Sequence, residues 1–185
     1  MIRIISGKYK GRYLLVPPSK VTRPTMDKVR QAIFSALKDK CINSISLDLF
    51  AGSGAYGIET ISRGGKKSYL NEKDKSTFSV IIKNVNQLND LKDTFNLTCL
   101  DYRLFLKKFK DIKFDLVFLD PPYRFKINDS IIEYLVLNNM LNESAVIISE
   151  QDFKNKDISY FRLKEYNYGR KYVGLYYYLG KNDEK

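Results

Sequence analysis

Short apolar runs and longer amphipathic segments alternate along most of this chain, which is the pattern of a β-sheet covered by helices. Apolar runs between polar or glycine-rich turns predict strands at residues 45–51, 68–71, 96–100, 115–119 and 145–149. Apolar positions at helical spacing predict helices at residues 55–62, 75–89, 102–110 and 127–138. Because parallel strands need long crossover connections, we expect right-handed βαβ units in a mainly parallel sheet with helices on both faces.

The two ends of the chain depart from this alternation. Residues 3–16 are predicted to form an extended segment turned at Gly7 and Gly11, and a helix of three to four turns is predicted after Pro24. Residues 159–167 and 172–179 indicate an antiparallel hairpin around Gly169 that closes the sheet edge. We therefore expect one α/β domain over residues 1–185, in which residues 1–40 form an extension packed on a core of residues 44–180.

Length and composition narrow the class of protein. A chain of 185 residues fits one domain, and no apolar run approaches the ~20 residues that span a bilayer. The first ten residues lack the apolar segment of a signal peptide, so we expect a cytoplasmic protein without membrane contact. The absence of histidine excludes Ser-His-Asp and Cys-His catalysis and the usual catalytic zinc sites. Cys41 and Cys99 have no CxxC spacing, so we expect neither a metal site nor a disulfide framework.

The positive charge is concentrated near the beginning of the chain. The formal net charge is +11, and residues 1–40 hold ten basic and two acidic side chains, a net +8 that leaves +3 for the remaining 145 residues. The loop Lys8-Tyr9-Lys10-Gly11-Arg12 is predicted to be exposed and basic. Clustered cations beside tyrosines are typical of surfaces that neutralise nucleic-acid phosphates, so we expect a nucleic-acid partner.

A glycine-rich turn indicates a cofactor site. Gly52-Ser53-Gly54-Ala55-Tyr56-Gly57 matches GxGxxG and lies between a predicted strand and a predicted helix, the context in which this motif binds nucleotide cofactors. Glu72 follows Gly52 by twenty residues, at the end of the second strand, where a carboxylate can accept hydrogen bonds from ribose hydroxyls. These residues alone suit both a nicotinamide dinucleotide and S-adenosylmethionine.

Asp48 separates these two cofactors. It lies four residues before Gly52, where a fixed negative charge opposes a pyrophosphate but attracts the sulfonium and ammonium groups of S-adenosylmethionine. The sequence therefore favours a methyl donor over the dinucleotide of an oxidoreductase. Asp101, at the end of the third strand, is then expected to reach the adenine amino group, although the same residue also suits capping of the following helix.

The turn Asp120-Pro121-Pro122-Tyr123 follows the fourth strand, at the sheet edge where open α/β folds hold their reacting groups. Two prolines remove two N–H donors and leave carbonyl acceptors to face a ligand. An exocyclic amine of a nucleobase is a poor nucleophile, because its lone pair is delocalised into the ring. The Asp120 carboxylate and the Pro121 carbonyl can each accept one N–H and direct that lone pair at a methyl group, while Tyr123 stacks on the base.

Together these segments resemble a known family. The resemblance is carried by Arg3-Ile4-Ile5-Ser6-Gly7 with Lys10-Gly11-Arg12, Thr22-Arg23-Pro24-Thr25 with Val29-Arg30 and Ile33-Phe34, Asp48-Leu49-Phe50-Ala51-Gly52-Ser53-Gly54, and Asp120-Pro121-Pro122-Tyr123. Over nearly its whole length the chain is similar to the RsmD family of 16S ribosomal RNA guanine-N2 methyltransferases. The Arg-Pro-Thr helix start and the basic glycine loop are more particular to this family than the other two turns. One departure is that members often carry phenylalanine where Tyr123 stands.

This resemblance implies a Rossmann-like class I methyltransferase, with a mostly parallel seven-stranded sheet, that methylates a guanine N2 amine of 16S rRNA in an assembled or assembling small ribosomal subunit. In such a protein Asp48, Gly52 and Gly54 would hold the methionine part of S-adenosylmethionine, Glu72 the ribose and Asp101 the adenine, with Phe50 and Ser53 in the same cofactor-binding segment. Residues 120–123 would hold the target base. The residues expected to contact RNA are Lys8, Lys10, Arg12, Arg23, Thr25 and Arg30. We expect a monomer.

Two other functions remain open on the sequence. A DNA or RNA adenine-N6 or cytosine-N4 methyltransferase would use the same turn for another exocyclic amine, but 185 residues leave no space for the target-recognition domain that sequence-specific DNA enzymes usually add. Ribosomal RNA, which is recognised by its shape, suits the chain better. A non-catalytic RNA-binding module with a vestigial cofactor pocket is disfavoured, because Asp120 and the glycine turn are both intact.

Overall fold

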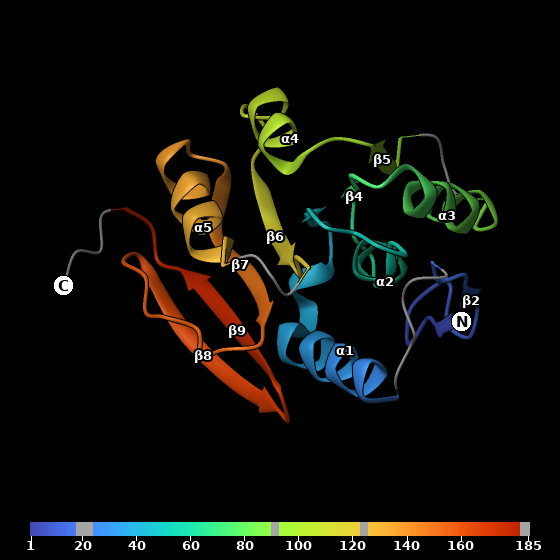
Figure 1. Ribbon diagram of the computed structural model, residues 1–185, viewed down its shortest axis with the longest axis horizontal. Coiled ribbons are helices and arrows are strands. Elements are labelled where there is room, and N and C mark those ends of the chain that lie inside the picture. Colours follow the sequence, from blue (N-terminus) through green and yellow to red (C-terminus); the bar gives the residue numbers. More distant parts are fainter. Residues whose placement is uncertain (18–23, 90–92, 123–125, 182–185) are drawn as a thin grey trace.

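A computed structural model describes residues 1–17, 24–89, 93–122 and 126–181 of the chain. The main sheet is built from β3 (Ile45–Asp48), β4 (Lys67–Asn71), β5 (Phe95–Thr98), β6 (Phe114–Leu119), β7 (Leu141–Gln151), β8 (Phe161–Tyr168) and β9 (Lys171–Tyr178). The helices are α1 (Pro24–Leu37), followed by the 3-10 helix η1 (Lys38–Cys41), α2 (Ala55–Ser62), α3 (Lys75–Asn86), α4 (Tyr102–Lys108) and α5 (Asn128–Leu137). The predicted alternation of strands and helices is confirmed (Figure 1).

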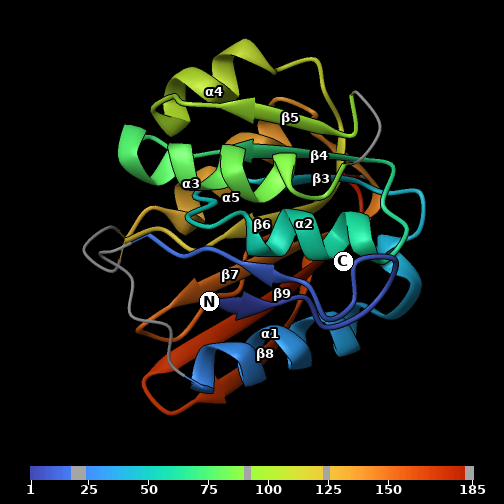
Figure 2. The same cartoon turned by 90° about the vertical axis from the view of Figure 1, so that its right-hand side faces the viewer.

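The seven strands of this sheet lie in the order β5-β4-β3-β6-β7-β9-β8, and Figure 2 shows them following one another from top to bottom. The neighbours from β5 to β7 pair in parallel, whereas β9 pairs antiparallel with both β7 and β8. The predicted mostly parallel sheet with a hairpin at its edge is therefore confirmed. Because β9 runs against the other strands, its first residues lie at the edge where β3, β4, β5, β6 and β7 end.

Helices cover both faces of the sheet, with α1, α2 and α3 in front of it in Figure 2 and α5 behind it. Alternate residues of β6 pack into the hydrophobic cores on opposite faces of the sheet. Leu116 and Phe118 pack with Phe34 of α1, whereas Val117 packs with residues of α4 and α5 such as Ile132. A strand buried on both faces explains why β6 is a continuous apolar run instead of an alternating one.

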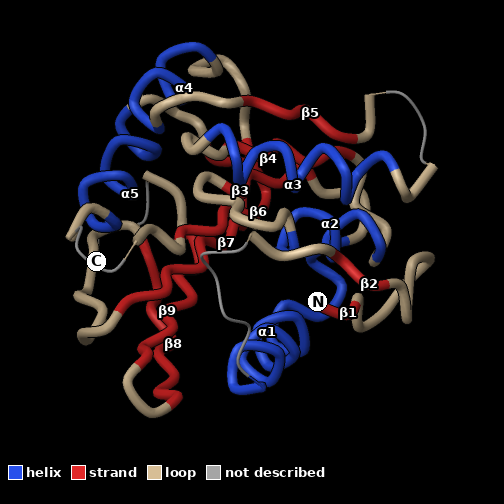
Figure 3. The backbone as a smooth tube through the Cα atoms, turned by 45° about the vertical axis from the view of Figure 1, so that its right-hand side comes forward, coloured by secondary structure: helices blue, strands red, loops and turns tan. Residues whose placement is uncertain are grey.

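The N-terminal segment forms its own two-stranded sheet beside α2 (Figure 3), in which β1 (Ile2–Arg3) pairs antiparallel with β2 (Tyr13–Leu14). Gly7 and Gly11 have φ angles of 83° and 88°, a left-handed region that favours glycine. The predicted extended segment turned at these two glycines is confirmed. We call residues 1–17 the N-terminal arm.

Several strand ends differ from the prediction. β3 ends at Asp48, three residues earlier than predicted, and β5 ends at Thr98, so Asp101 lies three residues beyond it. β7 begins at Leu141, four residues earlier than predicted, because Leu141 already pairs with Phe114 before a shift in register, after which Val146 pairs with Leu116. In the described part of the chain no helix is both long and apolar enough to cross a membrane.

Candidate active site

The glycine turn follows β3 at the edge of the sheet where the parallel strands end. The φ angles of Gly52 and Gly54 are 58° and 80°, so both lie in the left-handed region. At Gly57 the constraint is packing, because an added Cβ would lie 2.2 Å from Cδ2 of Leu70 and 2.4 Å from Oγ of Ser68. Glycine at this position lets α2 lie close to β4, as the third glycine of the motif requires.

Glu72 is held against this turn by its carboxylate. Oε2 accepts a hydrogen bond from the N–H of Gly52 at 3.0 Å, and Oε1 accepts one from the N–H of Asp74, also at 3.0 Å. A carboxylate offers about four acceptor positions, so both oxygens keep capacity for a further donor. The side chain is thus fixed in place, partly exposed, and able to accept from two hydroxyl groups.

Two buried asparagines, which were not among the predicted site residues, fix the surrounding backbone. Asn71 donates to the carbonyls of Leu49 and Leu100 at 3.2 and 3.0 Å, and so joins the segments after β3 and β5. Asn84 of α3 donates to the carbonyl of Ser53 in the glycine turn at 2.9 Å. Asn71 is the last residue of β4 and directly precedes Glu72, a signal that the sequence did contain.

Asp101 caps α4 and lies in an ion pair. Its Oδ1 accepts from the backbone N–H of Arg103 at 3.1 Å, and its Oδ2 accepts from Nζ of Lys73 at 3.0 Å. The hydrogen bond from Lys73 is the main reason that the pKa of this carboxyl is lowered. The ring of Phe50 lies 5.7 Å from that of Tyr102, so Phe50 and Asp101 border the same part of the edge. The adenine contact of Asp101 stays a prediction.

The Asp-Pro-Pro turn lies next to the glycine turn, because their strands are neighbours. Asp48, whose side chain is 2% exposed, pairs with Phe118 across β3 and β6, and Asp120 follows Phe118 by two residues. Pro121 is buried and Pro122 is exposed. Tyr123, the predicted stacking residue, lies outside the described residues.

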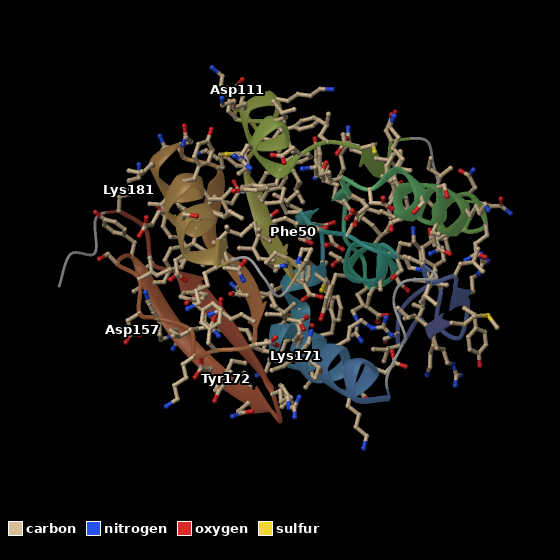
Figure 4. All side chains as sticks on the ribbon, in the orientation of Figure 1. Phe50, Asp111, Asp157, Lys171, Tyr172 and Lys181 are labelled. Carbon is tan, nitrogen blue, oxygen red and sulfur yellow. The ribbon has the colours of Figure 1, made fainter. Side chains whose placement is uncertain are left out.

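A chain of polar side chains that the sequence patterns did not predict reaches Asp120 from two other strands and from α2. Nζ of Lys171, at the start of β9 (labelled in Figure 4), lies 3.5 Å from Oδ1 of Asp120 and 3.0 Å from Oε2 of Glu150. The hydroxyl of Tyr56, in the glycine turn motif, donates to Oε1 of Glu150. The ring of Tyr56 stacks on Phe118 at 4.9 Å.

Burial raises the pKa of two side chains in this polar network, Glu150 and Tyr56. Glu150 is 4% exposed, and desolvation followed by the negative charge of Asp120 raises its pKa, against the opposing effect of Lys171. Burial, followed by the charges of Glu150 and Asp120, also raises the pKa of Tyr56, so its hydroxyl remains protonated and donates. The sequence did offer a signal for Glu150 as a site residue, because this acid directly follows the predicted strand 145–149. It offered none for Lys171, which is one of several basic residues in the hairpin.

The N-terminal arm is docked on α2 by buried polar contacts. Glu59, 1% exposed, accepts hydrogen bonds from the backbone N–H groups of Ile5 and Ser6 at 2.8 and 3.0 Å. The N–H of Lys8 donates to the carbonyl of Ser62 at 2.8 Å. This docking leaves the side chains of Lys8 and Lys10 exposed on the arm.

The other residues predicted to contact RNA have different surroundings. Arg30 is 4% exposed and donates to the carbonyl of Arg3 at 2.6 Å, so it joins α1 to the arm. Arg12 is exposed but donates to the carbonyl of Gln87 at 3.1 Å, at the end of α3. Arg23 and the side chain of Thr25 lie outside the described residues. Lys8 and Arg12 both lie over the ring of Tyr9 on the exposed loop of the arm, so among the described residues of this prediction it is the buried Arg30 that is set apart.

The sheet order, with its antiparallel β9, and the two turns at one edge define the fold of class I S-adenosylmethionine-dependent methyltransferases. A solved methyltransferase structure from Escherichia coli aligns with 97% of this chain and 99% of its own, with a TM-score of 0.87 and 32% identity. Ribosomal RNA small subunit methyltransferase D of Haemophilus influenzae is 38% identical over 155 residues, which are 82% of this chain and 79% of that protein.

The protein of the same description from Escherichia coli is 36% identical over 154 residues, 83% of this chain and 76% of its own. A family model described as Conserved hypothetical protein 95 matches residues 2–177. The chain belongs to this family, the RsmD family of methyltransferases.

Proposed function

We propose that this protein transfers a methyl group from S-adenosylmethionine to the exocyclic N2 amine of a guanine in 16S ribosomal RNA. The observation that carries the proposal is the pairing of Asp48 with Phe118, which brings the glycine turn and the Asp-Pro-Pro turn to neighbouring positions on one sheet edge. A cofactor held by the first turn is then adjacent to a base held by the second.

The side chains around the glycine turn suit this cofactor. Asp48 supplies a buried negative charge near the sulfonium and ammonium groups, which it stabilises electrostatically. Glu72 keeps acceptor capacity for the two ribose hydroxyls, and Asp101, which follows β5 at the same edge, would accept from the adenine amino group. The bound cofactor supplies an electrophilic methyl group, so the protein needs no nucleophile of its own.

The Asp-Pro-Pro turn orients the amine. Asp120 and the carbonyl of Pro121 accept its two N–H groups, which directs the nitrogen lone pair along the line of transfer. The bound cofactor would supply the methyl group and keep the electron pair of the broken carbon–sulfur bond, and Asp120 would accept the proton that the nitrogen loses. Lys171 and Glu150 hold the Asp120 carboxylate in its orientation.

RNA as the substrate is supported by family membership and by charge. The relatives from Haemophilus influenzae and Escherichia coli are described as small subunit ribosomal RNA methyltransferases. Lys8 and Lys10 are exposed on the N-terminal arm, which docks at the end of α2 through Ser62, and their charges can neutralise phosphates of a bound RNA.

The direct test incubates the protein with isotope-labelled S-adenosylmethionine and small subunits that lack the modification, with free 16S rRNA in parallel. Mass spectrometry of the digested RNA should identify N2-methylguanosine. Asp120→Ala should abolish transfer while the Kd for S-adenosylmethionine, measured by calorimetry, changes little, and Asp111→Ala, an exposed acid beyond α4, serves as the matched control. A methylated adenine or cytosine would assign another amino-methyltransferase, and RNA binding without transfer would indicate a non-catalytic module.

A further inference from the structure

The fold divides the basic residues of the first forty positions between different surfaces. Arg12 and Arg30 are engaged in contacts within the protein, whereas Lys38 and Lys40 lie in η1, directly after α1. There they line an open groove of about 730 Å³ together with Arg162, Lys164 and Tyr177 of the hairpin. Asp39 is the one acid among the described residues that line this groove, so its lining carries a net charge of +3.

The groove continues along β8 as a stripe of alternating side chains. Tyr166 and Tyr168 pack against the core on the α1 side, whereas Phe161 and Leu163 pack on the opposite side. Because side chains alternate along a strand, Arg162 and Lys164 share the side of Tyr166 and Tyr168. We call Arg162, Lys164, Tyr166 and Tyr168 the β8 stripe. Its strand is the outer strand of the sheet (Figure 3).

Cations and rings are interleaved in this stripe. The Arg162 guanidinium lies 4.9 Å from the centroid of Tyr177, and Nζ of Lys164 lies 5.2 Å from that of Tyr166. The rings of Tyr166 and Tyr168 are stacked at 6.4 Å with an interplanar angle of 23°. Glu165, the acid within the strand, accepts from the N–H of Asn155 at 2.6 Å and belongs to the other face. Aromatic faces that alternate with cations on a sheet are the chemistry that binds single-stranded nucleic acid.

The stripe leads to the catalytic edge. Tyr168 pairs with Lys171, which contacts Asp120, so the Tyr168 end of the stripe adjoins the Asp-Pro-Pro turn. At a rise of about 3.3 Å per residue, the strand from Arg162 to Tyr168 extends about 20 Å away from that edge. An RNA strand whose guanine enters the active site can therefore follow β8 toward Lys38 and Lys40.

We propose that the β8 stripe and the adjoining groove bind the RNA that flanks the methylated guanine, with the cations on phosphates and the tyrosines against unpaired bases. This inference rests on the proposed function for its substrate. It assigns the C-terminal hairpin, instead of the N-terminal arm alone, to RNA binding.

The test compares the stripe variant Arg162→Gln/Lys164→Gln with a control variant, Lys107→Gln/Lys108→Gln. The control removes two exposed cations at the end of α4, and it is matched because Nζ of Lys108 also lies over an aromatic ring, that of Phe109, at 5.4 Å. Binding of transcribed 16S rRNA is measured at several KCl concentrations. The stripe variant should bind roughly tenfold more weakly near physiological salt, and the slope of log K against log[KCl] should shrink by about 0.7 for each phosphate that the protein no longer neutralises. The α4 pair should keep the wild-type slope.

Further measurements separate the possible outcomes. The Kd for S-adenosylmethionine and the kcat at saturating RNA should stay unchanged in the stripe variant, and Tyr166→Leu should weaken RNA binding without altering the salt slope. Equal slopes for the stripe variant and the wild type would overturn the proposal. So would a loss of binding confined to assembled subunits, which would assign the surface to a ribosomal protein. Because RNA binding is measured without methyl transfer, these experiments test the role of the β8 stripe separately from the proposed function. Either proposal can therefore be contradicted while the other stands.

Discussion

The ammonium of Lys171 lies 3.5 Å from the carboxylate of Asp120, although the two residues are fifty-one positions apart in the sequence. The contact exists because β9 runs antiparallel beside β7, so its first residue returns to the edge where β6 ends. Lys171 is 15% exposed and also contacts Glu150, so its ammonium lies between two carboxylates. Such a partly buried ion pair fixes the orientation of the groups it joins.

Lys171→Met should lower kcat by roughly 10- to 100-fold, the coupling expected of a close charged pair, with little change in the Kd for S-adenosylmethionine. Lys171→Arg should retain most of the activity. The decisive measurement is a double-mutant cycle with Asp120→Asn. If Lys171 acts through Asp120, adding Lys171→Met to Asp120→Asn lowers the residual rate no further, whereas independent, multiplicative losses would mean that Lys171 has a separate structural role.

Glu72→Ala should weaken binding of S-adenosylmethionine by about 1–3 kcal/mol, because it removes charged acceptors for the ribose hydroxyls and releases the N–H of Gly52. Calorimetry gives the Kd directly. Asp74→Ala is the matched control, since Asp74 caps α3 by accepting from the N–H of Thr77 at 2.7 Å and lies on the same loop. That variant should lose stability, because the helix cap is lost, but should keep its cofactor affinity. Equal losses of affinity in both variants would contradict the assigned role of Glu72.

Stability should depend on pH through Glu150. Because its folded pKa is raised above the ordinary value of 4.5, its contribution to stability is present below that pH and is lost as the pH rises through the folded pKa. Glu150→Gln cannot lose this proton. The free energy of unfolding of the variant minus that of the wild type should therefore become more positive as the pH rises above the ordinary pKa of 4.5. Denaturant titrations at several pH values measure this difference, and a constant difference would show that Glu150 ionises normally.

Gly7 and Gly11 provide a matched pair for the docking of the N-terminal arm. At Gly7 an added Cβ would lie 1.7 Å from the carbonyl oxygen of Ser62, whereas at Gly11 the nearest atom, of Arg3, is 3.9 Å away. Both have positive φ, so Gly11→Ala should cost only the backbone strain of about 1–2 kcal/mol, and Gly7→Ala should also displace the arm.

Hydrogen exchange reads this difference at the amides of Ile5 and Ser6, which donate to Glu59. Their protection should be lost in Gly7→Ala and kept in Gly11→Ala, with β3 protected in both variants. Loss of protection throughout the sheet would mean that the arm is part of the folding core instead of a docked extension.

Local patterns predicted the βα alternation because buried parallel strands are short apolar runs, and the helices between them bury one face. The exact ends of the strands could not be predicted as well. Asn142, Glu143 and Ser144 have the polarity of a loop, yet they belong to β7, where Asn142 donates to Asp115 at 2.8 Å and Ser144 adopts a φ of 60°. A polar stretch near the beginning of a strand cannot be distinguished from a loop by periodicity.

The candidate site was predictable where its residues lie at strand ends, since Asp48 is the last residue of β3 and Glu72 and Asp120 directly follow β4 and β6. The contact between Glu150 and Lys171 could not be predicted in this way, because it depends on the order β6-β7-β9, which the alternation of elements does not determine. Arg30 shows that the charge of a residue does not by itself predict its exposure. Its charge counted toward a basic segment, but the fold buries it against the carbonyl of Arg3.

A crystal structure with S-adenosylhomocysteine bound would test whether the glycine turn holds the methyl donor facing Asp120, on which the proposed reaction depends. We predict ribose hydroxyls within hydrogen-bond distance of the Glu72 carboxylate, the amino group of the ligand beside Asp48, and the sulfur atom directed toward the Asp-Pro-Pro turn. A ligand bound elsewhere, or a turn that instead accepts the pyrophosphate of a nicotinamide dinucleotide, would contradict this arrangement.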